Sequence, residues 1–133
     1  MSTATQLMAQ YAAYHRDRRN IATHFVGIPL IVFAVGALLA RPSFGVGNWM
    51  LTPAAIVWGL SSLWYLTRGN LALGLATSLA NLLLIAAALP LGQLETLPWL
   101  AWSLGTFIVG WAAQFIGHYY EGRKPAFVDD LRG

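Results

Sequence analysis

Four long runs of apolar residues dominate the chain, and short polar stretches separate them. The runs lie at about residues 21–40, 49–67, 71–91 and 97–117. Each is close to the roughly 20 residues that an α-helix needs to cross the hydrocarbon core of a bilayer. Between the first two runs, residues 41–48 are rich in turn formers and predict a loop. The pattern therefore predicts four membrane-spanning helices joined by short connections.

A shorter amphipathic helix is predicted over residues 3–19. Its large side chains recur at helical spacing: Leu7, Met8, Tyr11, Tyr14 and His15. The arginines at its end suit lipid headgroups, so we expect the helix to lie in the membrane interface, with an ordinary solvated helix as the alternative. Asn20 is a candidate N-cap of the first spanning helix, because its side chain can accept a hydrogen bond from a backbone N–H.

Two details of the spans bear on packing. Pro29 can kink the first span, which membrane helices tolerate when neighbouring groups bind the released carbonyl. The third span carries small residues and the polar Thr77, Ser78 and Asn81, a composition typical of helix–helix contacts. We assign Asn81 a structural role rather than a catalytic one, because it lies too deep to meet the histidines described below.

Composition and charge support a membrane protein. The 133 residues are 57% hydrophobic and 10% charged, whereas a soluble domain carries about 25% charged residues. Four spans place both termini on the same side of the membrane. Only Arg41 lies in a connection on the opposite side, and the other basic residues lie on the side of the termini, which the positive-inside rule assigns to the cytoplasm. We therefore predict one all-α domain over residues 1–133: an integral membrane four-helix bundle with a cytoplasmic tail at 118–133. The basic clusters indicate topology rather than a nucleic-acid partner.

Three histidines fall at the predicted cytoplasmic edge: His15, His24 and His118. In one straight helix, nine residues at about 100° each would place His15 and His24 on opposite faces. They can converge only if the chain bends near Asn20. Imidazole binds iron, zinc, copper and nickel, and the chain has no cysteine, which argues against a thiolate zinc site. A three-histidine metal site is one interpretation, and interfacial histidines that only form hydrogen bonds are the other.

A polar stripe surrounds the last histidine. Gln114, His118 and Glu121 share one face of a helix, so Gln114 and Glu121 can orient the His118 ring. Glu121 can also be a ligand itself, or form hydrogen bonds at the end of the helix. Arg123 and Lys124 follow the last span. They can bind an anionic substrate head or lipid phosphate, or they can simply set the topology.

Two segments carry a family resemblance: YHRDRRNIATHFVGIPL, residues 14–30, and QFIGHYYEGRKPA, residues 114–126. Separated by hydrophobic spans, they resemble the signature blocks of the membrane-embedded 2-hydroxy fatty acid dioxygenase family. The residues that fit the pattern are His15, Asn20, His24, Gly27, Pro29, Gln114, Gly117, His118, Glu121 and Pro125.

This resemblance implies an Fe(II)-dependent enzyme of fatty acid α-oxidation, which shortens a 2-hydroxy fatty acid by one carbon with O2. His15, His24 and His118 would be the iron ligands, and Arg123 or Lys124 would hold the substrate carboxylate. The expected location is the inner membrane in a bacterium or the endoplasmic reticulum in a eukaryote. The alternatives are a non-enzymatic membrane scaffold or lipid-binding protein, and a zinc-dependent lipid hydrolase that uses the same histidines.

Overall fold

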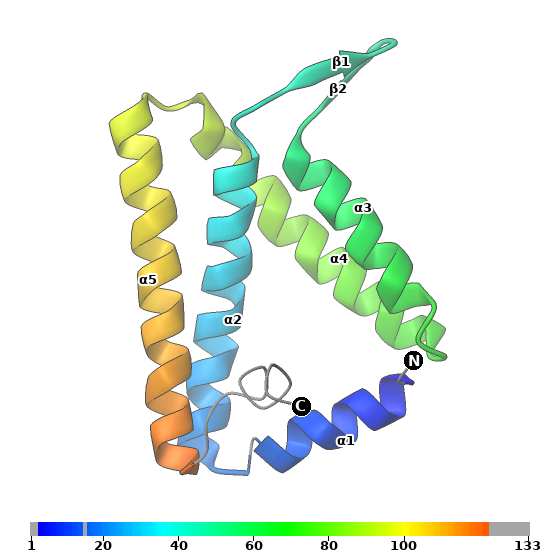
Figure 1. Ribbon diagram of the computed structural model, residues 1–133, viewed down its shortest axis with the longest axis vertical. Coiled ribbons are helices and arrows are strands. Elements are labelled where there is room, and N and C mark those ends of the chain that lie inside the picture. Colours follow the sequence, from blue (N-terminus) through cyan, green and yellow to red (C-terminus); the bar gives the residue numbers. More distant parts are fainter. Residues whose placement is uncertain (1–2, 15, 123–133) are drawn as a thin grey trace, which may run out of the picture.

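The computed structural model describes residues 3–14 and 16–122, which are almost entirely helical (Figure 1). Five α-helices, one short 3-10 helix (η1) and one β-hairpin make up this part of the chain. Their bounds are α1 (Ala4–Tyr14), α2 (Arg18–Leu39), β1 (Phe44–Val46), β2 (Trp49–Leu51), α3 (Pro53–Leu66), α4 (Leu71–Ala88), η1 (Leu89–Gln93) and α5 (Thr96–Glu121). The predicted all-α class is confirmed, with the small hairpin as an addition.

Three of the helical segments are long and apolar enough to cross a membrane: Arg18–Leu39, Leu71–Gln93 and Thr96–Glu121. The second predicted span, at 49–67, is wrong at its start. Trp49–Leu51 is a strand that pairs antiparallel with Phe44–Val46, so the connection expected to be a loop is a hairpin. Helix α3 begins only at Pro53, where the Thr52 side chain accepts a hydrogen bond from Ala55 N. With 14 residues it is about 21 Å long, shorter than the roughly 30 Å hydrocarbon core.

The helices pack as two pairs, α2 with α5 and α3 with α4 (Figure 1). The pairs meet through contacts between α2 and α4, and they diverge toward the end of the molecule that holds α1. This arrangement is more open than the four-helix bundle that we expected. In the second pair, Gly74 allows close packing, since a Cβ there would lie 2.8 Å from Tyr65 O. Asn81 lines a small cavity of about 190 Å³ between α2, α3 and α4, remote from the histidines.

Three helix boundaries differ from the prediction. Helix α1 ends at Tyr14, not residue 19, and α2 begins at Arg18 after a break in the helix. The break therefore precedes Asn20, and the N-cap is Asp17, whose side chain accepts a hydrogen bond from Arg19 N. Helix α5 continues to Glu121 and ends at Gly122, which adopts a left-handed conformation with φ of 73°. The tail predicted from residue 118 thus begins four residues too early.

Helices α2 and α5 approach each other closely at glycines. A Cβ on Gly27 would lie 2.8 Å from Gly110 O, and a Cβ on Gly110 would lie 3.0 Å from Gly27 O. Since lipid tails are as apolar as leucine side chains, membrane helices associate through such close packing rather than through the hydrophobic effect. The glycines therefore hold this pair of helices together.

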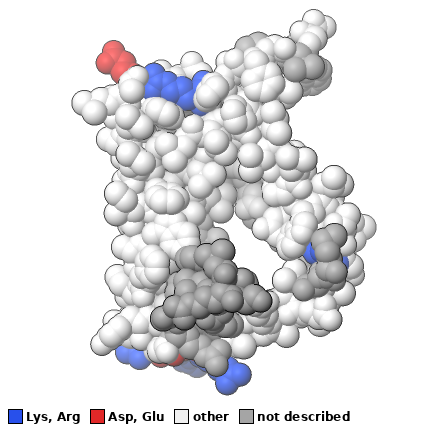
Figure 2. All heavy atoms as spheres, viewed as in Figure 1, with Lys and Arg blue, Asp and Glu red and all other residues white. Residues whose placement is uncertain are grey.

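On the face that Figure 2 shows, charged side chains lie at the top, at the bottom and at one place on the right side, and the surface between them is uncharged. At one end, Arg41 donates a hydrogen bond to Thr96 Oγ1 at 2.8 Å. At the other end, the backbone N–H of Ala4 donates to Arg68 O at 2.7 Å, which joins the start of α1 to the turn between α3 and α4. An uncharged surface between charged ends is typical of a membrane-embedded region, and the assignment of the α1 end to the cytoplasm stays a prediction.

We predict that Gly27→Ala destabilises the α2–α5 pair. The new methyl group would lie 2.7 Å from Gln114 Oε1 and 2.8 Å from Gly110 O, so one helix must shift. Overpacking of this kind costs about 1–3 kcal/mol. Thermal unfolding in detergent, followed by circular dichroism, measures the loss. Gly105→Ala on α5 is the control, because its Cβ meets nothing within 4 Å. Equal unfolding temperatures for the two variants would contradict the close contact.

Candidate functional site

The structure brings His24 and His118 together. His24 lies near the start of α2 and His118 in the last turn of α5, and their ring centroids are 4.9 Å apart at an interplanar angle of 85°. Both side chains are buried, with exposed fractions of 4% and 7%. Two buried imidazoles in edge-to-face contact at one end of a pair of long apolar helices form the core of a candidate site.

A backbone carbonyl orients the His24 ring. Nδ1 of His24 lies 2.9 Å from Asn20 O, one helical turn earlier. A carbonyl oxygen can only accept, so Nδ1 carries the hydrogen, and in the neutral ring Nε2 carries the lone pair. This is the arrangement by which proteins fix the tautomer of a metal-binding histidine. The contact of Asn20 with the His24 ring is thus made by the backbone carbonyl, and a supporting role of Asn20 in the site stays a prediction.

Gly117 allows the two histidines to meet. A Cβ at this position on α5 would collide with the side-chain oxygens of Thr23 and Asn20, and it would lie 3.2 Å from His24 Nδ1. Gly117 directly precedes His118, so the absence of a side chain at Gly117 leaves room for Asn20, Thr23 and the His24 ring beside the place where the two rings meet. The packing of the helices and the geometry of the site are thus one feature.

Glu121 ties the end of α5 to the chain that enters α2. Its carboxylate accepts hydrogen bonds from Arg16 N at 2.8 Å, from Asp17 N at 2.6 Å and from Asn20 Nδ2 at 3.3 Å. Backbone N–H groups before a helix favour a carboxylate partner, because they lack an acceptor within the helix. Of the roles considered for Glu121, these contacts support that of a hydrogen-bonding residue that fixes the approach to α2.

Gln114 lies one turn before His118 and is buried. Its Oε1 faces Gly27, and this oxygen accepts no hydrogen bond from the part of the chain that the structure describes. The expected contact that would orient the His118 ring therefore stays a prediction. Gln114 contributes instead to the close packing of α2 against α5.

Three predicted site residues lie outside the described residues: His15, Arg123 and Lys124. Within residues 3–14 and 16–122, no third histidine, aspartate or glutamate joins His24 and His118 in a group that could hold a metal. The residues on either side of His15 in the sequence belong to this end of the molecule, since Tyr14 ends α1 and Arg16 N donates to Glu121.

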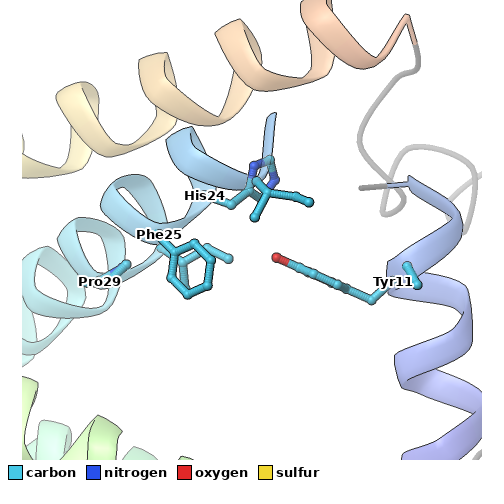
Figure 3. A pocket seen from close by; sticks show the side chains of 7 residues that line it. Tyr11, His24, Phe25 and Pro29 are labelled. Carbon is cyan, nitrogen blue, oxygen red and sulfur yellow. The ribbon is translucent and has the colours of Figure 1, made fainter. Parts of the chain in front are cut away.

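A pocket of about 440 Å³ adjoins His24 between α1 and α2. It is lined by Tyr11, Ala12, Ile21, His24, Phe25, Ile28 and Pro29. The Tyr11 hydroxyl points across the pocket toward α2 (Figure 3), and the Tyr11 ring centroid lies 6.4 Å from that of His24. Partial burial raises the pKa of Tyr11 above its ordinary value, so the hydroxyl stays protonated and can donate.

Sequence reasoning placed Tyr11 only on the apolar side of an amphipathic helix. Its approach to His24 depends on the break between α1 and α2, which turns α1 back across the end of the molecule (Figure 1). No local pattern encodes that turn, and the one available signal was an aromatic residue with a hydroxyl near a histidine-containing segment.

The chain matches a family model over residues 1–132, described as 2-hydroxy-palmitic acid dioxygenase Mpo1-like. The chain belongs to the Mpo1-like family. A curated Mpo1-like relative, the 2-hydroxy-palmitic acid dioxygenase MPO1 of Saccharomyces cerevisiae, is 31% identical over 123 residues. The match covers 91% of this chain and 66% of the yeast protein, slightly less than two thirds of its length. No solved structure matches this chain. The family expected from the two signature segments is confirmed.

We predict that Glu121→Ala loosens the connection between α1 and α2. Loss of hydrogen bonds to a charged acceptor costs about 1.5–3 kcal/mol, which lowers protection of the amides by roughly 10- to 100-fold. Hydrogen exchange of the Arg16 and Asp17 amides, followed by mass spectrometry in detergent, measures this change. Glu95→Ala is the matched control, because Glu95 forms no side-chain cap at the start of α5. Unchanged exchange in Glu121→Ala would show that the carboxylate does not hold this segment.

Proposed function

We propose that this Mpo1-like protein is an Fe(II)-dependent dioxygenase that shortens 2-hydroxy fatty acids by one carbon. The observation that carries the proposal is the buried pair His24 and His118, which lies in the two segments that resemble the family's signature blocks. The name of the yeast relative supports the substrate class and the use of O2. The long apolar helices support a multi-pass membrane protein that takes its substrate from the bilayer.

The described residues fit a metal ion of this kind. His24 has its tautomer fixed by Asn20 O, and His118 lies ring to ring with it. We assign His15 as the third ligand, since it directly precedes the segment that Glu121 holds beside the pair. When bound, Fe(II) supplies redox chemistry with O2 and open positions for the oxygens of a 2-hydroxy acid.

The proposed reaction balances without an external reductant. A 2-hydroxy acid and O2 give the acid one carbon shorter, CO2 and water. The bond between C1 and C2 breaks, C1 leaves as CO2, C2 is oxidised to the new carboxyl carbon, and O2 is reduced. The substrate supplies all four electrons that reduce O2.

The residues of this chain orient the reactants and limit access of water. Asn20 fixes the His24 ring, and Gly117 lets α5 place His118 against it. His24 and His118 lie at the end of α2 and α5 beside α1, and we place this end at the polar interface, where an acid headgroup is stable. Arg123 or Lys124 would hold the substrate carboxylate by charge, as the sequence predicts.

We predict that wild-type protein, purified without a histidine tag, contains iron and converts 2-hydroxyhexadecanoate to pentadecanoate. Replacement of any one of the three histidines, in His15→Ala, His24→Ala or His118→Ala, should lower the amount of bound iron and reduce conversion by more than about 100-fold. This loss is larger than the loss expected when a residue that only supports a metal ligand is removed. Metal analysis and product quantification measure both effects, and the membrane fraction checks insertion. Tyr119→Ala is the matched control, because Tyr119 follows His118 but is 82% exposed.

The outcomes separate three functions. Full activity in the triple histidine variant would exclude the proposed site. Zinc in place of iron, together with ester or amide hydrolysis, would favour a lipid hydrolase. Protein that contains no metal and turns over no lipid would favour a scaffold or lipid-binding role.

A further inference from the structure

We propose that the pocket between α1 and α2 binds the acyl chain of the 2-hydroxy acid, with the Tyr11 hydroxyl positioning the acid head beside His24. This inference rests on the proposed function and assigns it a substrate-binding site. It also makes Ile28, which lies in the part of the pocket away from His24, a determinant of the length of the acyl chain that the pocket accepts.

The pocket has the polarity of a fatty acid along its length. Ile21, His24, Phe25 and Ile28 follow one another at helical spacing and share one face of α2. From His24 the lining continues to Pro29, five residues later, which is about 7.5 Å along the helix axis. A ligand whose head lies at His24 therefore extends its tail past Phe25 and Ile28, toward the middle of the span.

The polar groups of the pocket are few and lie at one end. His24 and Tyr11 supply them, and the other lining side chains are apolar. Figure 3 shows the Tyr11 hydroxyl directed across the pocket, toward the part of α2 that carries His24 and Phe25. A phenol hydroxyl donates a hydrogen bond to a carboxylate or a hydroxyl oxygen. The volume of about 440 Å³ lies within the range of about 300–1,000 Å³ typical of small-molecule sites.

Helix α1 is fixed at both ends, so it forms a stable wall of the pocket. Its first residue, Ala4, donates its backbone N–H to Arg68 O at 2.7 Å. Beyond its last residue, Glu121 accepts from Arg16 N and Asp17 N. These hydrogen bonds fix the position of α1, and with it Tyr11, relative to α2.

Three other pockets are not lined by the histidines. They lie beside Ala4 and Arg68, beside Asn81, and between Leu30 of α2 and Val109 of α5, with volumes of about 270, 190 and 340 Å³. None of them offers a histidine to the reacting head of the acid. The pocket that His24 itself lines is therefore the one that we assign to the substrate.

A bulky side chain at Ile28 tests the chain-length assignment. Each methylene group buried in an apolar site tightens binding by about fourfold. Ile28→Trp fills the far part of the pocket, so the KM for 2-hydroxyhexadecanoate should rise about tenfold or more, while that for 2-hydroxybutanoate, whose two-carbon tail ends before Ile28, stays the same. Val26→Trp is the matched control on the same helix, because Val26 is 58% exposed and does not line the pocket. An unchanged ratio of the two KM values in Ile28→Trp would overturn the assignment.

Removing one oxygen tests the role of Tyr11. Loss of a hydrogen bond to a charged group weakens binding by roughly 10- to 100-fold. Tyr11→Phe should therefore raise the KM for 2-hydroxyhexadecanoate by that factor and leave the iron content unchanged. Tyr119→Phe should change neither quantity. Unchanged KM in Tyr11→Phe would overturn the positioning role.

Photo-cross-linking locates the chain without requiring turnover. The probe is 2-hydroxyhexadecanoate with a diazirine in its tail, applied to the protein in phospholipid nanodiscs. We expect adducts on the peptide that contains Phe25 and Ile28, and competition by unlabelled 2-hydroxyhexadecanoate. Adducts on this peptide without iron or turnover would retain the pocket and reject the dioxygenase. Turnover with adducts confined to other helices, or a pocket labelled only by a diacyl phospholipid probe, would reject the pocket.

Discussion

The close approach of α2 and α5 is the constraint on which the rest of the molecule depends. In a bilayer, apolar surface gains nothing by moving from lipid to protein, so two helices must associate through tight packing and polar contacts. Gly27, Gly110 and Gly117 provide the packing along the interface, because side chains at these positions would clash with the opposite helix. The same contact places His24 against His118. Association of the helices and assembly of the site therefore require the same backbone geometry.

Polar contacts at one end convert this helix pair into a defined site. Glu121 accepts from the backbone that leads into α2, and Asn20 contributes both its side-chain amide and its carbonyl, the latter to His24. One carboxylate and one amide residue thus join the end of α5, the start of α2 and a histidine ring. In a membrane such groups need hydrogen-bond partners within the protein, because no water is available there. Each hydrogen bond of this network would then contribute more to stability than the same bond at a surface in water.

Hydrophobic periodicity and hydrophobic length predicted most of the architecture, because both are local properties of the sequence. They predicted the helical class, the long apolar segments and the polar stripe of Gln114, His118 and Glu121 on one helix. They misplaced the start of α3, since the apolar Trp49–Leu51 has the composition of a span and only Pro53 marks the new helix. They also missed Tyr11 as a pocket residue, because its position depends on the direction of α1 after the break before Arg18. Such directions are set by long-range bonds, here those of Ala4 and Glu121.

The attachment of α1 at both ends has a mechanical consequence. This helix connects the turn between α3 and α4 with the ends of α2 and α5, so it bridges the divergent ends of the two helix pairs. Membrane thickness changes the tilt of spanning helices, and any change in the angle between the pairs must move one attachment of α1 relative to the other. Tyr11 moves with that helix. The angle between the two helix pairs is thereby coupled to the width of the opening beside His24.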